Sequence, residues 1–555
     1  MLLLDMVHHN PGLVNYKSKY LDPKFLKERG YTGKTFDLFN CAQYGLLFDG
    51  LSKKFNRAPV FPKGSKARKY VINKRRKLKN LYKKVVNEGL SVSFMMDIIV
   101  LPVALTKIYP EVLNEENKID ISLPFTRLIL EELFDEMFSV FPEINGIFVR
   151  YGETYTGEKY GEPYHVGNNP ILKGEDYHLI LIDILQEFVC KKHGRDIYYR
   201  TWGFGDFQYD RQKYLTISSK IPKHEKFYFC IKHTTGDFHR CSVFNQSLNC
   251  GKHNQIIEIQ CAREYEGKGA YPNYIAGGVI NGFEEFSYLM PDDRPRCLKD
   301  LLSKKDNLIK GVWTWSRGGG WDGPYINGKN GKNGEVVIKN GSEIWCDLNA
   351  YVISQWINNP KKTDKDYVLQ YAEEILGASK KDAETFYKIC ELSTRAVLLG
   401  RGSNTDKYQW NVWWTRDQNV RPEIFEANAN CAFEYDGGEL LLLEKQQAVS
   451  IWEEIVALSK TITNCKDLDF IKVSCEYGYY LFSIYETMFR AKIFSLKNLS
   501  VSDIVNEYET LWSSWRKLKE KNPCCPTLYA KENAKQELIG YNYNSGLDSC
   551  MIYSK

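Results

Sequence analysis

Three acidic side chains each follow a segment that has the pattern of a buried β-strand. Glu153, Asp237 and Glu264 come within a few positions of the ends of three such segments. Because the carboxyl ends of barrel strands meet on one face, these carboxylates are expected to converge on one cleft. Two carboxylates in different surroundings can act as a general acid and as a base or nucleophile, as glycoside cleavage requires. A single such acid is more often a salt-bridged loop residue, but three of them favour a catalytic site.

Two cations occur in the same part of the chain. Arg200 lies in a strand-like segment and Lys232 ends another. A cation that points into a barrel is costly unless it is paired. Its partner could be one of the three acids, or it could be an anion on a substrate. An Arg fork and a Lys point charge would together suit the carboxylate of a uronic acid.

Aromatic residues make up 14% of the chain, with 12 Trp and 37 Tyr. Flat rings with a polar edge suit a sugar-binding cleft. Trp202, Trp315 and Trp321 follow or end strand-like segments and are candidate sugar platforms. Any one of them could equally be a core residue.

Eight strand-like segments precede residue 320, and amphipathic helical patterns separate many of them. The segments are Leu2–Val7, Thr35–Phe39, Leu90–Met96, Gly146–Tyr151, Ile197–Trp202, Phe227–Lys232, Ile256–Cys261 and Gly311–Trp315. Most are short and apolar, as expected for strands buried on both faces. The alternation predicts the α/β class, with a (β/α)8 TIM barrel over residues 1–355. Residues 356–555 carry helical patterns and predict an α-helical C-terminal domain.

Charge is nearly balanced, at 75 − 69 = +6. This small excess argues against a dedicated nucleic-acid binder. One segment, 65–84, is locally basic and has apolar residues at helical spacing. We interpret it as the solvated face of a barrel helix, with a polyanion-binding patch as the alternative. The glycine-rich segment 317–335 contains a GxGxxG match, but Pro324 follows where a phosphate-binding helix should begin.

The 15 cysteines are scattered, and no pair of them has metal-ligand spacing. No metal or cofactor is predicted. The N-terminus lacks the basic start of a signal peptide, and no long apolar run predicts a membrane span. We expect a cytoplasmic location, or a periplasmic or secreted one if a signal peptide was removed.

The segment from about 200 to 285 resembles the xylan α-glucuronidases of glycoside hydrolase family 67. Ile231–Phe238 is similar to that family's VKNGPIDF segment, and Glu258–Gly267 is similar to its EFQITQEYLG segment. Glu153–Gly157 stands where the family has its acid loop. The resemblance implies a barrel with a C-terminal helical domain. It also implies an activity that releases a uronic acid during polysaccharide degradation.

The resemblance also implies residue roles. Glu153 would be the general acid, with Glu158 as its main rival, and Asp237 with Glu264 would activate an inverting water. Arg200 and Lys232 would hold the uronate carboxylate. The expected partner is a uronate-bearing oligosaccharide, and a homodimer is a possible assembly. Two alternatives remain open: a retaining glycosidase with Glu264 as nucleophile, and a glycan-binding relative without turnover.

Overall fold

A computed structural model describes most of the chain. The described residues are 1–8, 17–151, 162–167, 174–202, 206–291, 293–319, 324–326, 329–330, 335–336, 338–416 and 419–528. The predicted acid Glu153, its rival Glu158 and the candidate platform Trp321 lie outside them.

Eight parallel strands form a closed barrel in the order β1, β10, β9, β8, β7, β5, β3, β2. The strands are β1 Leu2–His8, β2 Gly33–Phe36, β3 Ser91–Asp97, β5 Ile144–Arg150, β7 Asp196–Arg200, β8 Phe227–Lys232, β9 Asn254–Gln260 and β10 Ile309–Gly318. All eight predicted segments coincide with these strands to within a few residues. The barrel closes because β1 pairs with both β2 and β10. The predicted fold class is confirmed.

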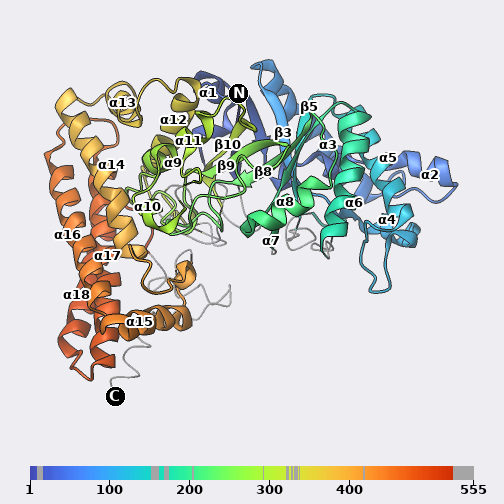
Figure 1. Ribbon diagram of the computed structural model, residues 1–555. Coiled ribbons are helices and arrows are strands. Elements are labelled where there is room, and N and C mark those ends of the chain that lie inside the picture. The colour runs from blue at the N-terminus through green and yellow to red at the C-terminus, as the bar shows by residue number, and fades with distance from the viewer. Residues whose placement is uncertain are drawn as a thin grey trace.

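Helices surround the barrel (Figure 1). They are α1 Pro23–Glu28, α2 Asp49–Phe55, α3 Lys66–Asn87, α4 Val103–Ile108, α5 Pro124–Val140, α6 Glu175–Leu185, α7 Asp206–Tyr209, α8 Arg211–Ser219, α9 Ala276–Asn281, α10 Phe286–Leu289, α11 Leu298–Leu302 and α12 Ile344–Asn358. Helices α5 and α6 each lie between successive strands of the barrel, in agreement with the predicted alternation. A π-helical turn, Gln186–Lys191, continues α6. Among the described residues, three short strand pairs lie outside the barrel: β4 Val100–Pro102 with β6 His165–Gly167, β11 Lys329–Asn330 with β12 Glu335–Val336, and β13 Thr415–Arg416 with β14 Asn419–Val420.

Helices follow α12 to the end of the described chain. They are α13 Asp364–Gln370, α14 Lys380–Arg401, α15 Pro422–Asp436, α16 Glu439–Thr461, α17 Leu468–Leu496 and α18 Ser502–Lys521. Thr363 and Asp366 form a reciprocal capping box at the start of α13. The long helices α14, α16, α17 and α18 stand side by side as a limb at one end of the barrel (Figure 1). The predicted boundary at residue 355 falls inside α12, which packs on β10, and it stays a prediction.

Side chains of the barrel strands alternate between two environments. Inward positions form a compact apolar cluster that includes Met95, Phe148, Tyr198, Cys230 and Ile256. Outward positions pack against the surrounding helices in a second, larger cluster. Among the described residues, no helix combines the length and apolar composition needed to cross a bilayer.

Candidate active site at the carboxyl ends of the strands

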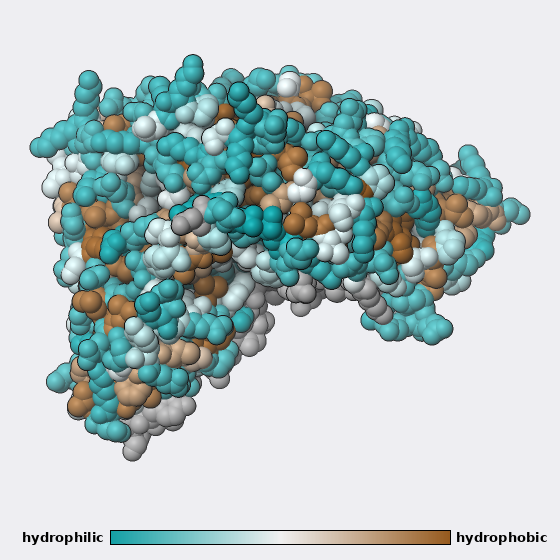
Figure 2. Space-filling model, viewed as in Figure 1, coloured by the Kyte–Doolittle hydropathy of each residue, from teal (hydrophilic) through white to brown (hydrophobic). Residues whose placement is uncertain are grey.

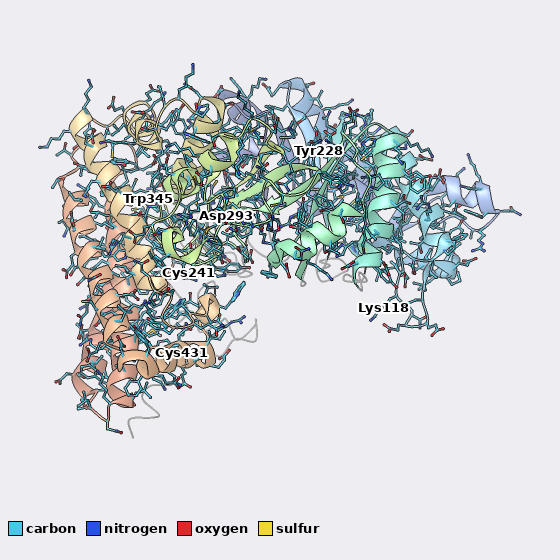
Figure 3. All side chains as sticks on the ribbon, in the orientation of Figure 1. Lys118, Tyr228, Cys241, Asp293, Trp345 and Cys431 are labelled. Atoms are coloured by element: carbon cyan, nitrogen blue, oxygen red, sulfur yellow. The ribbon has the colours of Figure 1, made fainter. Side chains whose placement is uncertain are left out.

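The carboxyl ends of the strands lie on the lower side of the barrel as drawn in Figure 3. Figure 3 labels Tyr228, near the start of β8, on the upper side, and Cys241, in the loop after β8, on the lower side. The surface is hollowed on this lower side, between the barrel and the lower part of the limb (Figure 2). Barrel enzymes place their active sites at this end.

Charged side chains form the last inward layer of the barrel before this end. Two residues beyond the five cluster members named above, the same strand faces carry Asp97 on β3, Arg150 on β5, Arg200 on β7, Lys232 on β8 and Glu258 on β9. We call these five residues the charged layer. Each is less than 5% exposed, so each needs a partner of opposite charge. The barrel interior therefore changes from apolar to ionic just below the mouth.

Four of the five residues of the charged layer form two ion pairs. The Arg150 guanidinium donates to the Asp97 carboxylate at 3.2 Å. Arg200 donates from Nε and Nη2 to the two oxygens of Glu258, at 2.8 and 2.7 Å. Arg200 thus has an internal partner, which was one of the two alternatives for it, although the partner is none of the three predicted acids. With an exposed fraction of 2%, it lies below the mouth and supports the site from beneath.

The remaining cation of the charged layer reaches one of the predicted acids. Lys232 Nζ donates to Asp237 Oδ1 at 2.5 Å. The ammonium also lies 3.7 Å from the ring centroid of Trp202 and 4.5 Å from that of Phe238. The loop after β8 thus folds back on its own strand end and holds the Asp237 carboxylate over the barrel. Cation–π contacts of this kind stabilise the ammonium in a desolvated setting.

Asp237 has surroundings that favour its ionised form. Burial alone raises the pKa of Asp237, but the Lys232 ammonium and the Phe238 N–H outweigh burial and hold that pKa below its usual range. An ionised carboxylate accepts protons and can activate water or attack directly. It is a poor proton donor at neutral pH, so a second group must protonate a leaving oxygen.

Glu264 lies in the loop after the neighbouring strand, β9. Its backbone N–H donates to the side-chain oxygen of Gln260, at 2.6 Å, which fixes the start of the loop to the strand end. Its carboxylate packs against the backbone of Gly319, directly after β10; a Cβ at Gly319 would overlap it. Gly319 has φ +83°, a conformation that side-chain-bearing residues rarely adopt. Glycine at 319 therefore leaves room for the candidate carboxylate.

The loops that carry Asp237 and Glu264 touch one another. The ring of His239 stacks on that of Tyr265, with centroids 5.1 Å apart and an interplanar angle of 11°. The backbone N–H of His239 donates to the backbone carbonyl of Asp237 at 2.7 Å. Tyr265 directly follows Glu264 in the chain. Two of the three predicted acids are thus brought to one end of the barrel, on adjacent loops.

A tryptophan from the helical region covers this contact. Trp413 lies in the short helical turn Val412–Trp414, and its ring centroid is 4.4 Å from that of His239 and 5.1 Å from that of Tyr265. Sequence reasoning did not single out Trp413, His239 or Tyr265. No local pattern distinguishes Trp413, because its contact partners are some 150 positions away in the chain.

Buried ion pairs stabilise the same two loops from behind. Arg240 pairs with Glu285, and Arg263 donates to Glu266 at 2.8 Å. Burial alone raises the pKa of Glu266, but the Arg263 and Arg401 charges lower it to about 2. Burial lowers the pKa of His239 to about 3, so its imidazole is neutral across the physiological range. The loops are thus held by fixed charges, with a neutral ring between them.

The candidate sugar platforms have different settings. Trp202 is half-buried beside Lys232 at the mouth. Trp315 is only 6% exposed and belongs to the apolar cluster inside the barrel, where its ring contacts those of His8 and Phe238. Trp202 therefore fits a platform, and Trp315 fits the core alternative. Within the described part of the chain, no group of His, Cys, Asp and Glu side chains could hold a metal ion.

No protein-family model matches the chain, and no curated protein matches it. A mutant O-GlcNAc hydrolase from Thermobaculum terrenum is a weakly similar solved structure, with 10% identity and a TM-score of 0.37 over 100% of this chain and 93% of that one. A second, named CpGH84D, has 10% identity and a TM-score of 0.38 over 93% of this chain and 68% of its own. Similarity at this level says nothing about the chemistry of this chain, whose fold follows from its own closed barrel. The likeness to family 67 rests on the quoted residues alone.

Proposed function

We propose that this barrel is a glycoside hydrolase that removes a terminal uronic acid from a glycan, in the manner of an α-glucuronidase. The observation that carries the proposal is the Lys232–Asp237 ion pair at the carboxyl end of β8, beside the loop that carries Glu264. It supplies an ionised carboxylate at the barrel mouth, with a second carboxylate on the adjacent loop. That is the pair of groups that glycosidic bond cleavage needs.

The proposed reaction is hydrolysis with inversion. Asp237, together with Glu264, accepts a proton from water as the water oxygen attacks the anomeric carbon. The bond to the leaving oxygen breaks, and that oxygen takes a proton from a general acid, for which the family resemblance proposes Glu153. Inversion requires about 6.5–9.5 Å between the acid and base carboxyl groups, which leaves room for the water.

The substrate side of the proposal is a sugar that carries its own carboxylate. An ammonium has three donors, and Lys232 uses one of them on Asp237. The others can meet an anionic group, while the half-buried ring of Trp202 next to it can carry a pyranose face. Arg200 supports this arrangement through Glu258 and has no direct role in binding the substrate.

The test is a panel of uronate-capped oligosaccharides, with matched neutral caps, read by NMR of the released sugar. Release of the uronic acid with inverted anomeric configuration is expected, and the Asp237→Asn variant should release none. Retention of configuration would instead assign Glu264 as a nucleophile. If uronate-capped glycans bind without any release, the chain is a glycan-binding protein and the enzymatic proposal is wrong.

A further inference from the structure

Helix α3 carries an unusual concentration of positive charge. Its 22 residues include ten Lys or Arg and no Asp or Glu. The whole chain has 75 basic and 69 acidic residues, so without α3 it would have 75 − 10 = 65 basic residues and a net charge of −4. The positive balance of the protein is therefore the property of one helix.

The cations at the flanks of α3 have acidic partners from neighbouring elements. Arg68 pairs with Asp49 at 2.7 Å, and Arg75 pairs with Glu136 at 2.6 Å. Lys74 donates to Glu162 at 2.5 Å. These three contacts fix the helix to its neighbouring elements.

The exposed cations of the helix form a separate set, which we call the cationic stripe: Lys66, Lys69, Arg76, Lys77, Lys83 and Lys84. Across the described residues, none of the six takes part in an ion pair; Arg76 contacts only the Asn73 amide oxygen, at 3.4 Å. At 100° per residue they fall within an arc of about 120°, and at 1.5 Å per residue they span about 27 Å. A row of positive charge thus follows the helix axis, in three pairs of cations separated by about 9–11 Å.

Packing fixes the direction in which this row faces. The buried side of α3 consists of Val71, Leu78, Tyr82 and Val85 and packs into the main core. That face is centred roughly opposite the cationic stripe on a helical wheel. Because the apolar face is occupied, the helix cannot insert it into a bilayer, so a partner must be held by charge alone.

We propose that the cationic stripe binds a linear acidic polysaccharide, holding a polymeric substrate to the outside of the barrel. Charge complementarity calls for a polyanion, and the length of the row calls for a repeating one. No exposed aromatic side chain interrupts the stripe to stack on bases, since Tyr70 is bonded to Glu162 and Tyr82 is buried. The choice of a uronate polymer rests on the proposed function of the barrel.

The position of the helix agrees with this role. Lys74, in the first half of α3, reaches Glu162, in the segment that follows β5. Segments that follow strands lie at the mouth of the barrel. The stripe therefore starts on the mouth side and runs back along the outer wall beside β2 and β3, across the barrel from β8 and β9. Only a polymer long enough to cross the mouth can occupy the stripe and the candidate site together.

The experiment is affinity electrophoresis of the full chain in gels containing polygalacturonate, over a range of salt concentrations. The variant is Lys69→Gln/Lys77→Gln/Lys84→Gln. The control is Lys304→Gln/Lys305→Gln/Lys380→Gln, which removes the same charge from exposed lysines elsewhere. We expect the wild type and the control to be retarded alike and the stripe variant to bind at least ~10-fold more weakly. The dependence on salt should also become shallower, by about the three contacts removed.

Three results would overturn the proposal: no retardation of the wild type, equal weakening in both triple variants, or tighter stripe-dependent binding of single-stranded DNA or anionic vesicles. Melting curves of both variants confirm that they fold. Failure of the barrel chemistry is a separate outcome, because polymer binding is measured without turnover. If the chain binds polygalacturonate through the stripe but releases no uronic acid, the binding proposal holds and the proposed function is wrong.

Discussion

Arg200 and Glu258 face each other inside the barrel from β7 and β9, with β8 between them. Two parallel hydrogen bonds, 2.8 and 2.7 Å long, join the guanidinium to the carboxylate. The guanidinium also lies 5.7 and 5.5 Å from the ring centroids of Trp313 and Trp315. The pair covers the apolar interior at the carboxyl end of the barrel and lies directly beneath the candidate site.

Removing one partner of this pair should destabilise the protein. Glu258→Gln leaves a buried guanidinium without its counter-charge, and we expect a loss of about 3–5 kcal/mol in the free energy of unfolding, measured by urea denaturation. The double variant Arg200→Met/Glu258→Leu should lose less, because no unpaired charge remains. If Arg200→Ala left stability unchanged and altered only the preference for uronates over neutral sugars, Arg200 would be a substrate ligand after all.

Asp237 should be indispensable for turnover, and its replacement should also lower stability, because Lys232 loses its buried counter-charge. Asp237→Asn keeps the shape of the side chain but removes the negative charge that accepts a proton. We expect kcat to fall by a factor of about 10³ or more, with a smaller change in KM. Asp210→Asn, a helix-cap change on the outside of the barrel, is the matched control. If the Asp237→Asn variant keeps a near-normal kcat, this carboxylate is not catalytic.

The pH profile should report the same group. The pKa of Asp237 is lowered in the folded chain, so the carboxylate stays ionised until the pH falls through that lowered value. Activity should therefore persist below the ordinary Asp range on the acidic side of the kcat/KM profile. The stabilisation from the Lys232 pair is present above the unfolded-state pKa and is lost over the same fall. Replacing Lys232 with Met should move the acidic limb to higher pH.

Gly319 offers a probe of Glu264 that leaves the carboxylate itself intact. Gly319→Ala would place a methyl group where the Glu264 side chain lies. We expect at least ~10-fold lower kcat as the carboxylate is pushed aside. Gly64→Ala is the matched control, since Gly64 has nearly the same φ, +82°, with open space around it. Both variants carry the same backbone strain, so an equal loss of activity in both would argue against a specific contact with Glu264.

Trp413 should couple the helical region to the loops that carry Asp237 and Glu264. Trp413→Ala removes the ring that covers His239 and Tyr265, so the loops that carry Asp237 and Glu264 lose a shared support. We expect a 5- to 50-fold loss of kcat, of the order of 1–2 kcal/mol, with recovery of most activity in Trp413→Phe. A lower melting temperature without any change in kcat would indicate a purely structural contact.

The sequence alone was enough to predict the barrel and to place several residues of the candidate site at one end of it. Strand segments such as Phe227–Lys232 are short, apolar and followed by polar residues, a pattern that local chemistry imposes on any buried parallel strand. The placement of Asp237 and Glu264 just past such segments was sufficient to predict that they share one end of the barrel. Lys232 was predicted to lie there too, because it ends its strand.

Only the tertiary structure decided which charges meet. Arg200 could have faced a substrate or an internal acid, and its partner, Glu258, is known only from the alternation and register of three strands. The contact of Trp413 with His239 likewise depends on how the helical region folds back on the barrel. Sequence patterns record the environment of each residue, whereas pairing across the chain depends on packing, which local patterns do not encode.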